Sequence, residues 1–194
     1  VDAAEADAEV AERVNTIAPK LMAEYCQSQD IPLIQISTDF VFDGTQGRPY
    51  AVNDCTNALG VYGQTKLAAE QHVLGAPKGY VLRTAWVYSE HGANFIKTML
   101  RLAGQRSQLG VVADQVGSPT YAANLAAATW ALLQEEPSQR LFHYSDAGIC
   151  SWYDFALAAF ELGAVKGLID KVPEVSPLTT NQYPTPAARP SYSV

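Results

Sequence analysis

Two side chains in this sequence are spaced to share one face of a helix and to do acid–base chemistry together. Tyr62 and Lys66 lie four residues apart at the start of a helix-like run that ends near Leu74. An ammonium group beside a phenol favours the phenolate, so we expect Lys66 to lower the pKa of Tyr62 toward neutral pH. Such a tyrosine could donate a proton to a reacting oxygen. The spacing alone is weak evidence, because a tyrosine and a lysine on an exposed helix face would show it too.

A hydroxyl group lies upstream of this pair, at the end of a predicted strand. The apolar run from Ile31 to Ile36 predicts a strand covered on both sheet faces, and Ser37, Thr38 and Asp39 follow it. Open α/β sheets bind their ligands at the carboxyl ends of the strands, so Thr38 is placed where a substrate would lie. Asp39 either caps a turn or contacts the substrate.

Motifs along nearly the whole chain resemble those of the extended short-chain dehydrogenase/reductases. More narrowly, the chain resembles the dTDP-4-dehydrorhamnose reductases. The matching segments are residues 1–5 (VDAAE), 37–44 (STDFVFDG), 62–66 (YGQTK), 83–88 (RTAWVY), 94–95 (NF), 114–120 (DQVGSPT) and 184–190 (PTPAARP).

The resemblance implies that Thr38, Tyr62 and Lys66 are catalytic and reduce a ketone of a nucleotide sugar with NADPH or NADH. In that scheme Tyr62 donates the proton, Thr38 orients the same oxygen, and Lys66 also binds the nicotinamide ribose. The predicted cofactor contacts are Ser37, Tyr62, Lys66 and Arg83. The predicted substrate contacts are Thr38, Asp39, Trp86, Asn94, Gln115 and Arg189. We assign no residue to a metal, and Mg²⁺ remains a second candidate cofactor beside the dinucleotide.

Several of these side chains also have a purely structural explanation. Arg83 interrupts an apolar strand, and a buried arginine usually pairs with an acid, here one on a neighbouring helix. Trp86 could belong to the core, whereas Asn94 and Gln115 could cap helices. Arg189 lies between prolines and is either a surface charge or a diphosphate ligand.

Three functions are consistent with these motifs. The leading one is reduction of the 4-keto group of dTDP-4-dehydro-L-rhamnose to dTDP-L-rhamnose. The alternatives are another nucleotide-sugar epimerase or reductase, and a non-catalytic regulatory subunit like that of methionine adenosyltransferase. Resembling dehydratases carry a glutamate directly after the aspartate, where this chain has Phe40, so dehydration by that mechanism is not expected.

Composition limits the partners and the compartment. The 194 residues carry 13 basic and 20 acidic side chains, and the resulting net charge of −7 argues against nucleic-acid binding. No apolar run approaches the roughly 20 residues that span a bilayer, so no membrane partner is expected. The three cysteines lack metal-type spacing and suit thiols in a cytoplasmic protein. We expect a small-molecule nucleotide sugar as the partner, with a homodimer as a further possibility.

Strand-like and helix-like runs alternate, which indicates an α/β fold with a mostly parallel, Rossmann-like sheet and helices on both faces. We expect residues 1–110 to be the remainder of an NAD(P)-binding domain. Residues 111–194 are expected to form a small mixed C-terminal region that completes the sheet and covers the sugar-nucleotide site. The glycine-rich turn that cradles a dinucleotide is not in the sequence, so the chain is expected to be a fragment that binds dinucleotide poorly alone.

The predicted elements follow apolar periodicity. Strands are predicted at 33–37, 80–85, 110–112 and 141–144, and helices at 3–28, 59–74, 93–106, 121–135 and 152–162. The first helix should bury the stripe made by Val10, Val14, Ile17, Leu21 and Tyr25. The last should begin with a capping-box-like pair, Ser151 and Asp154, and end at Gly163.

Overall fold

The main sheet of the computed structural model, which describes residues 1–194, contains three parallel strands. Their order is β1 (Leu33–Thr38), β2 (Gly79–Thr84) and β7 (Leu141–His143), with Thr38 of β1 beside Thr84 of β2. Every residue of β2 is buried, as expected for the middle strand of a sheet whose two faces are covered. Thr38 and Thr84 therefore end neighbouring strands at the same edge.

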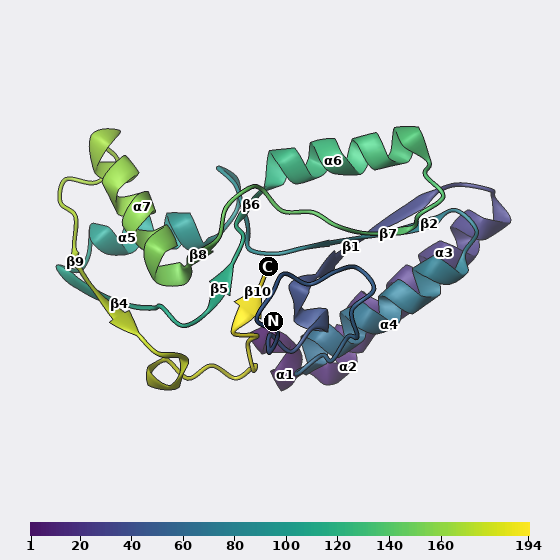
Figure 1. The fold of residues 1–194 in the computed structure, drawn as a ribbon, viewed down its shortest axis with the longest axis horizontal. Coiled ribbons are helices and arrows are strands. Elements are labelled where there is room, and N and C mark those ends of the chain that lie inside the picture. Colours follow the sequence, from purple (N-terminus) through teal and green to yellow (C-terminus); the bar gives the residue numbers. More distant parts are fainter.

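Helices cover both faces of this sheet (Figure 1). On one face lie α3 (Ala18–Ser28) and α4 (Val61–Gly75), and α6 (Ala122–Glu135) lies on the opposite side. The core between sheet and helices is formed by Ala23, Val73, Ala76 and Val81. The predicted α/β class with a mostly parallel sheet is confirmed.

The N-terminal segment is divided, where the sequence pattern predicts a single helix over 3–28. It contains α1 (Asp2–Ala6), α2 (Ala8–Glu12), a π-helical turn (Arg13–Ile17) and α3. Asp7 breaks the first helix and caps the second by accepting a hydrogen bond from the amide of Val10 at 3.0 Å. The π-helical turn ends just before Pro19, which has no N–H to donate to an α-helical hydrogen bond.

The stripe of large apolar residues on this segment faces outward, so its predicted burial is wrong. Its members are between 42% and 63% exposed: Val10, Val14, Ile17, Leu21 and Tyr25. Small residues are buried instead: Ala4, Ala11, Thr16, Pro19 and Ala23. Small side chains let this segment approach α4 closely, where the Thr16 hydroxyl donates to the carbonyl of Thr65 at 2.9 Å.

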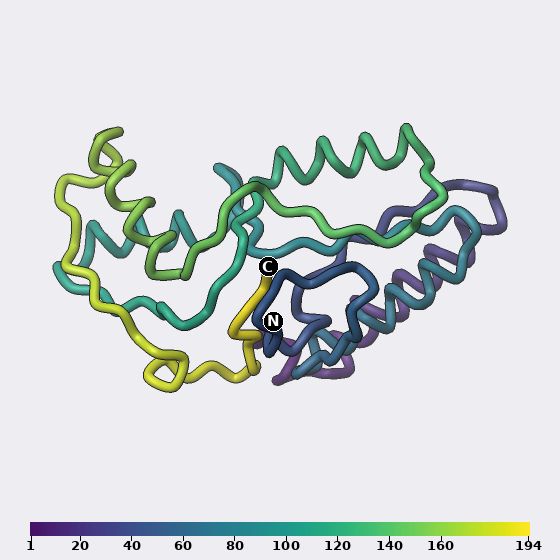
Figure 2. Tube along the Cα trace, viewed as in Figure 1, coloured from purple at the N-terminus to yellow at the C-terminus, as the bar shows by residue number.

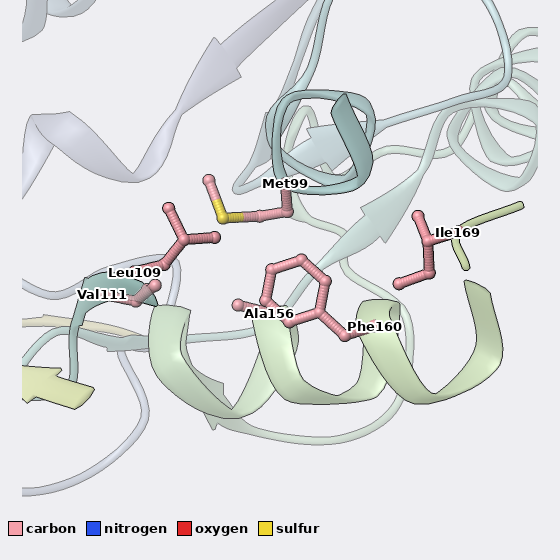
Figure 3. Packing of buried hydrophobic residues seen from close by; sticks show 6 residues of the cluster. All are labelled: Met99, Leu109, Val111, Ala156, Phe160 and Ile169. Atoms are coloured by element: carbon pink, nitrogen blue, oxygen red, sulfur yellow. The ribbon is translucent and has the colours of Figure 1, made fainter. Parts of the chain in front are cut away.

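A second, smaller lobe has its own apolar core (Figure 3). It consists of α5 (Phe95–Ala103), β4 (Gln108–Val112), α7 (Trp152–Val165) and β9 (Glu174–Leu178), with β4 and β9 paired in parallel. Its buried residues are Met99, Leu109, Val111, Ala156, Phe160 and Ile169.

Helix α7 begins as predicted and ends later than predicted. The capping box of Ser151 and Asp154 is confirmed. The helix continues through Gly163 to Val165, so the stop predicted at Gly163 is wrong. A Cβ at Gly163 would lie 2.6 Å from Cδ2 of Leu100, so this glycine allows α7 to pack closely against α5.

Short strands join the two lobes at the centre of the molecule. β3 (Val87–Tyr88) pairs with β6 (Thr120–Tyr121), and β5 (Val116–Gly117) pairs with both β8 (Cys150–Ser151) and β10 (Tyr192–Ser193). Figure 2 shows the chain crossing between the lobes and its C-terminal segment returning to the centre. The single division at residue 110 stays a prediction; within this fold α5 lies in the smaller lobe and β7 in the main sheet. None of the helices is both long enough and apolar enough to cross a bilayer.

Candidate active site

A cavity of about 450 Å³ lies at the carboxyl ends of β1 and β2. Its walls come from both lobes and from the C-terminal segment. It brings together eight of the predicted site residues: Ser37, Thr38, Asp39, Tyr62, Lys66, Trp86, Gln115 and Arg189. Arg83 and Asn94 do not line it. Its size suits a small ligand.

Thr38 and Tyr62 enter the cavity from the end of β1 and the start of α4. The Thr38 hydroxyl donates to Oδ1 of Asp39 at 2.9 Å and accepts from the amide of Phe40 at 3.2 Å. The ring of Phe40 packs edge-on against that of Tyr62, with centroids 5.6 Å apart. Burial raises the pKa of Tyr62 above its ordinary value, the hydrogen bond with Thr38 opposes this, and the charge of Asp39 adds to it. The phenol therefore stays protonated at neutral pH.

Lys66 lies one helical turn after Tyr62, and its ammonium is hydrogen-bonded to the backbone. Its Nζ donates to the carbonyl of Ile36 at 2.6 Å. Burial lowers the pKa of Lys66, and the negative charge of Glu70 partly offsets this. The prediction that the pKa of Tyr62 lies below its ordinary value is wrong for this structure, because the burial of the phenol raises it.

Asp39 carries a buried carboxylate oxygen, Oδ2, that has no hydrogen-bond partner. Burial raises the pKa of Asp39, while hydrogen bonds with Ser193 and Thr38 lower it. The turn that follows β1 is capped by Thr38 and not by Asp39, which leaves the aspartate without that structural role. Because Oδ2 is enclosed by the protein, Asp39 acts on the site through Thr38, which donates to its Oδ1.

Arg83 and Ser37 direct their polar atoms at Glu70. The guanidinium of Arg83 donates from Nε and Nη2 to the Glu70 carboxylate at 2.9 and 2.7 Å. The Ser37 hydroxyl donates to the same carboxylate at 2.5 Å. The Arg83 side chain is buried in an ion pair outside this cavity, which is the structural alternative that the sequence allowed, and its cofactor contact stays a prediction. Ser37 lines the cavity with its hydroxyl already engaged.

The other predicted substrate contacts separate into two groups. Asn94 is the N-cap of α5 and accepts from the amide of Lys97 at 3.1 Å, the structural alternative that the sequence allowed, so its substrate contact stays a prediction. Gln115 and Arg189 do line the cavity. Gln115 is held between Trp152 and Thr180, and Arg189 pairs with Asp2 at 2.8 Å.

Trp152 is a cavity residue that sequence reasoning missed. It is the first residue of α7 and stacks on Trp86 with ring centroids 3.5 Å apart. The sequence signal for this residue is a tryptophan directly after a helix-capping serine. A side chain at the start of a helix that lies between two lobes can contact residues of the other lobe.

The side chains of this chain form no group of three or more His, Cys, Asp or Glu residues that could hold a metal ion. The three cysteines, Cys26, Cys55 and Cys150, are free thiols. The Mg²⁺ expected from the resemblance therefore has no supporting group of ligands in these residues.

A parallel sheet with a threonine, a tyrosine and a lysine meeting at its carboxyl edge defines the class of NAD(P)-dependent short-chain dehydrogenase/reductases. Within that class the family can be named. Residues 1–194 match the family model described as the RmlD substrate binding domain, and the chain belongs to this family of dTDP-4-dehydrorhamnose reductases.

Two relatives and one solved structure illustrate the similarity. The chain is 39% identical to a dTDP-4-dehydrorhamnose reductase of Aggregatibacter actinomycetemcomitans, covering 100% of this chain and 68% of that protein. It is 43% identical to one of Mycolicibacterium smegmatis, covering 100% and 59%. The crystal structure of dTDP-4-dehydrorhamnose reductase from Bacillus anthracis in complex with NADP superimposes with a TM-score of 0.92 at 36% identity, covering 100% and 66%. The chain thus spans between 59% and 68% of the length of these proteins.

Proposed function

We propose that the protein reduces the 4-keto group of dTDP-4-dehydro-L-rhamnose to give dTDP-L-rhamnose, a precursor for polysaccharide biosynthesis, with NAD(P)H as the reductant. The observation that carries this proposal is the meeting of Thr38, Tyr62 and Lys66 in one cavity whose opposite wall is aromatic. Relatives that are 39% and 43% identical and carry the reductase name support the choice of substrate.

The residues divide the chemistry between them. When bound, the nicotinamide supplies the hydride to the carbonyl carbon. Tyr62 donates the proton to the carbonyl oxygen, and its raised pKa keeps the donor form populated at neutral pH. The Thr38 hydroxyl, which donates to Asp39 in this structure, would turn its proton toward the same oxygen and so orient it. The Lys66 ammonium stabilises the negative charge left on Tyr62 after the proton has moved.

The cavity fits the ribose end of a nicotinamide cofactor. The ammonium of Lys66 lies in the cavity wall and makes one hydrogen bond, to the carbonyl of Ile36, so two of its three donors remain for ribose hydroxyls. Tyr62 shares that wall. The structure of the Bacillus anthracis relative in complex with NADP supports a nicotinamide dinucleotide, NADPH or NADH, as the cofactor of this cavity. Lys66 and Tyr62 are thus the residues that would hold the cofactor, and Mg²⁺ is not included in the proposal.

The proposal extends to location and assembly. The free thiols of Cys26, Cys55 and Cys150 support the cytoplasm. The exposed apolar stripe on α2 and α3 supports the homodimer as a hypothesis, because large exposed apolar patches often mark protein contacts. Sedimentation of the full-length protein, with Val14→Glu as the disrupting variant, would test the dimer.

The test is an assay of the full-length protein with dTDP-4-dehydro-L-rhamnose and NADPH. Tyr62→Phe removes only the donated hydroxyl and should reduce turnover about 100-fold, with little change in substrate affinity. Tyr183→Phe makes the same chemical change at a tyrosine that is 58% exposed and should leave turnover unchanged. A wild-type protein that binds the sugar nucleotide without consuming NADPH would favour the regulatory subunit. Isomerisation of the sugar without net NADPH oxidation would favour the epimerase.

A further inference from the structure

Two indole rings meet in the cavity wall and come from different lobes. Trp86 and Trp152 stack with ring centroids 3.5 Å apart and planes 10° from parallel. Trp86 follows β2 of the main sheet, whereas Trp152 begins α7 of the smaller lobe, and both line the cavity. The smaller lobe therefore provides a flat support for a side chain that the main sheet places.

Trp86 needs such support because its backbone is in an unfavourable conformation. Its φ of +49° lies in the left-handed region, which costs a bulky residue of order 1–3 kcal/mol and persists only where the surroundings hold it. Gly117 provides the space for the indole. A Cβ at that position would lie 2.6 Å from Cε2 of Trp86 and 2.8 Å from its Nε1, so only a glycine leaves the ring where it is.

Trp152 is itself fixed in place, so it can act as a support. Its Nε1 donates to Oε1 of Gln115 at 3.2 Å, and its ring lies against Phe95 with centroids 4.7 Å apart. The capping box of Ser151 and Asp154 sets the start of the helix on which it stands. A side chain held by a hydrogen bond and by packing on its other face keeps one rotamer.

We infer that Trp152 is a positioning residue that holds Trp86 so that the edge of its indole, which lines the cavity, forms a wall of the sugar site. The wall would contact the apolar face of the sugar, which carries the C6 methyl group next to the carbon that bears the reacting oxygen. This inference rests on the proposed function, and it gives a role to a residue that does not touch the reacting atoms. A wall displaced by about 1 Å would misalign the carbonyl with Tyr62, which is how remote changes reduce catalysis.

The experiment uses the full-length protein with dTDP-4-dehydro-L-rhamnose and NADPH. Trp152→Leu removes the stacked ring, and Trp152→Phe keeps an aromatic face. The leucine variant should raise the KM of the ketosugar about tenfold and lower kcat severalfold, with the KM of NADPH unchanged within about twofold. The phenylalanine variant should recover most of that loss. Trp130→Leu makes the same change at an indole that is 61% exposed on α6, and it should change neither KM.

Two further measurements separate a positioning role from a general structural one. Stacked indoles produce an exciton couplet in far-ultraviolet circular dichroism, which Trp152→Leu and Trp86→Leu should abolish and Trp130→Leu should keep. Calorimetry with dTDP alone should give the same affinity for Trp152→Leu as for the wild type, because the wall faces the sugar. Weaker dTDP binding, or equal losses in the leucine and phenylalanine variants, would overturn the inference.

If Trp152→Leu does not fold, Gly117→Ala decides the matter by crowding the Trp86 ring from its other side. It should produce the same selective rise in the KM of the ketosugar, and an unchanged KM would overturn the inference. If the wild type reduces the ketosugar and both variants keep the wild-type KM for it, only the positioning role of Trp152 is refuted. A wild type that does not reduce it removes the proposed function, and the inference with it.

Discussion

The guanidinium of Arg83 and the carboxylate of Glu70 form a doubly hydrogen-bonded ion pair where β2 meets α4. Only 6% and 2% of the two side chains are exposed. Ser37, at the end of β1, donates to the same carboxylate. One buried acid therefore ties together both strands and the helix that position Thr38, Tyr62 and Lys66.

Removing the cation of this pair should destabilise the protein strongly. Arg83→Met leaves the Glu70 carboxylate buried without its partner, and breaking a buried pair in this way costs about 3–5 kcal/mol of the free energy of unfolding. Denaturant unfolding of the full-length protein measures the loss. The matched control is Arg48→Met, which breaks an ion pair with Asp54 whose arginine is 59% exposed, and it should cost much less because solvent screens the pair. Equal losses in the two variants would contradict the structural role of Arg83.

The same variant tests the predicted cofactor contact of Arg83. Because the guanidinium does not line the cavity, Arg83→Met should leave the KM of NADPH unchanged within about twofold at temperatures where the protein is folded. A large rise in that KM would restore the cofactor contact that the sequence resemblance implies.

Asn94 provides a second test, of a predicted substrate contact. As the N-cap of α5 it accepts a hydrogen bond from the amide of Lys97, so Asn94→Ala should cost about 1 kcal/mol of stability and leave the KM of the sugar nucleotide unchanged. Asn94→Ser retains a capping oxygen and should keep most of the stability. A raised KM in both variants, without loss of stability, would return Asn94 to the substrate site.

The meeting of Thr38, Tyr62 and Lys66 could be predicted because it depends on short-range spacing. Tyr62 and Lys66 are one helical turn apart, and Thr38 ends a strand whose apolar run is plain in the sequence. Parallel strands bring their carboxyl ends to one edge, so these residues meet as expected. The class of fold followed from the alternation of strands and helices along the chain.

The remaining features depend on contacts between distant parts of the chain. Val14 and Leu21 have the periodicity of a buried face, but they are exposed. The N-terminal segment packs on α4 through small residues such as Ala11 and Ala23, and the spacing of large apolar side chains does not reveal such a contact. The pKa of Tyr62 depends on its burial, which spacing does not report. The stack of Trp86 on Trp152 joins two lobes and has no local signature.

The long loop between β1 and α4 contains a group with a large and testable pKa shift. The Arg48 guanidinium, followed by the amide of Ala51, lowers the pKa of Asp54 from 3.8 to about 2. A depressed pKa in the folded state stabilises the protein above the unfolded pKa, and this contribution is lost as pH falls from about 5 to 2. The NMR shift of the Ala51 amide, which donates to Asp54 at 2.7 Å, should titrate with a midpoint near pH 2. Asp54→Asn should abolish this titration, and a midpoint near 4 would show that the loop contacts do not persist in solution.

Lys66 gives a prediction about alkaline pH, because the pKa values of the two neighbouring groups move in opposite directions. Burial lowers the pKa of Lys66 and raises that of Tyr62. Reduction requires a protonated phenol and an ammonium group, so activity should fall at alkaline pH when Lys66 loses its proton, while Tyr62 is still protonated. The alkaline limb of the pH–rate profile should therefore lie below 10.5, the ordinary pKa of lysine.

Lys66→Met tests this assignment, since methionine keeps an apolar side chain and removes the charge. In this variant the alkaline limb assigned to Lys66 should disappear from the pH–rate profile, and turnover should fall. The KM of NADPH should rise, because the ribose hydroxyls lose their hydrogen-bond donor. Lys20→Met, at a lysine whose side chain is 48% exposed, should leave the profile as it is in the wild type. A lysine that served only as a solvated surface group would change stability by about 0.5 kcal/mol at most and leave the kinetics alone. An unchanged profile together with unchanged NADPH affinity in Lys66→Met would therefore remove Lys66 from the site and leave Tyr62 without the cation on which the proposed reduction depends.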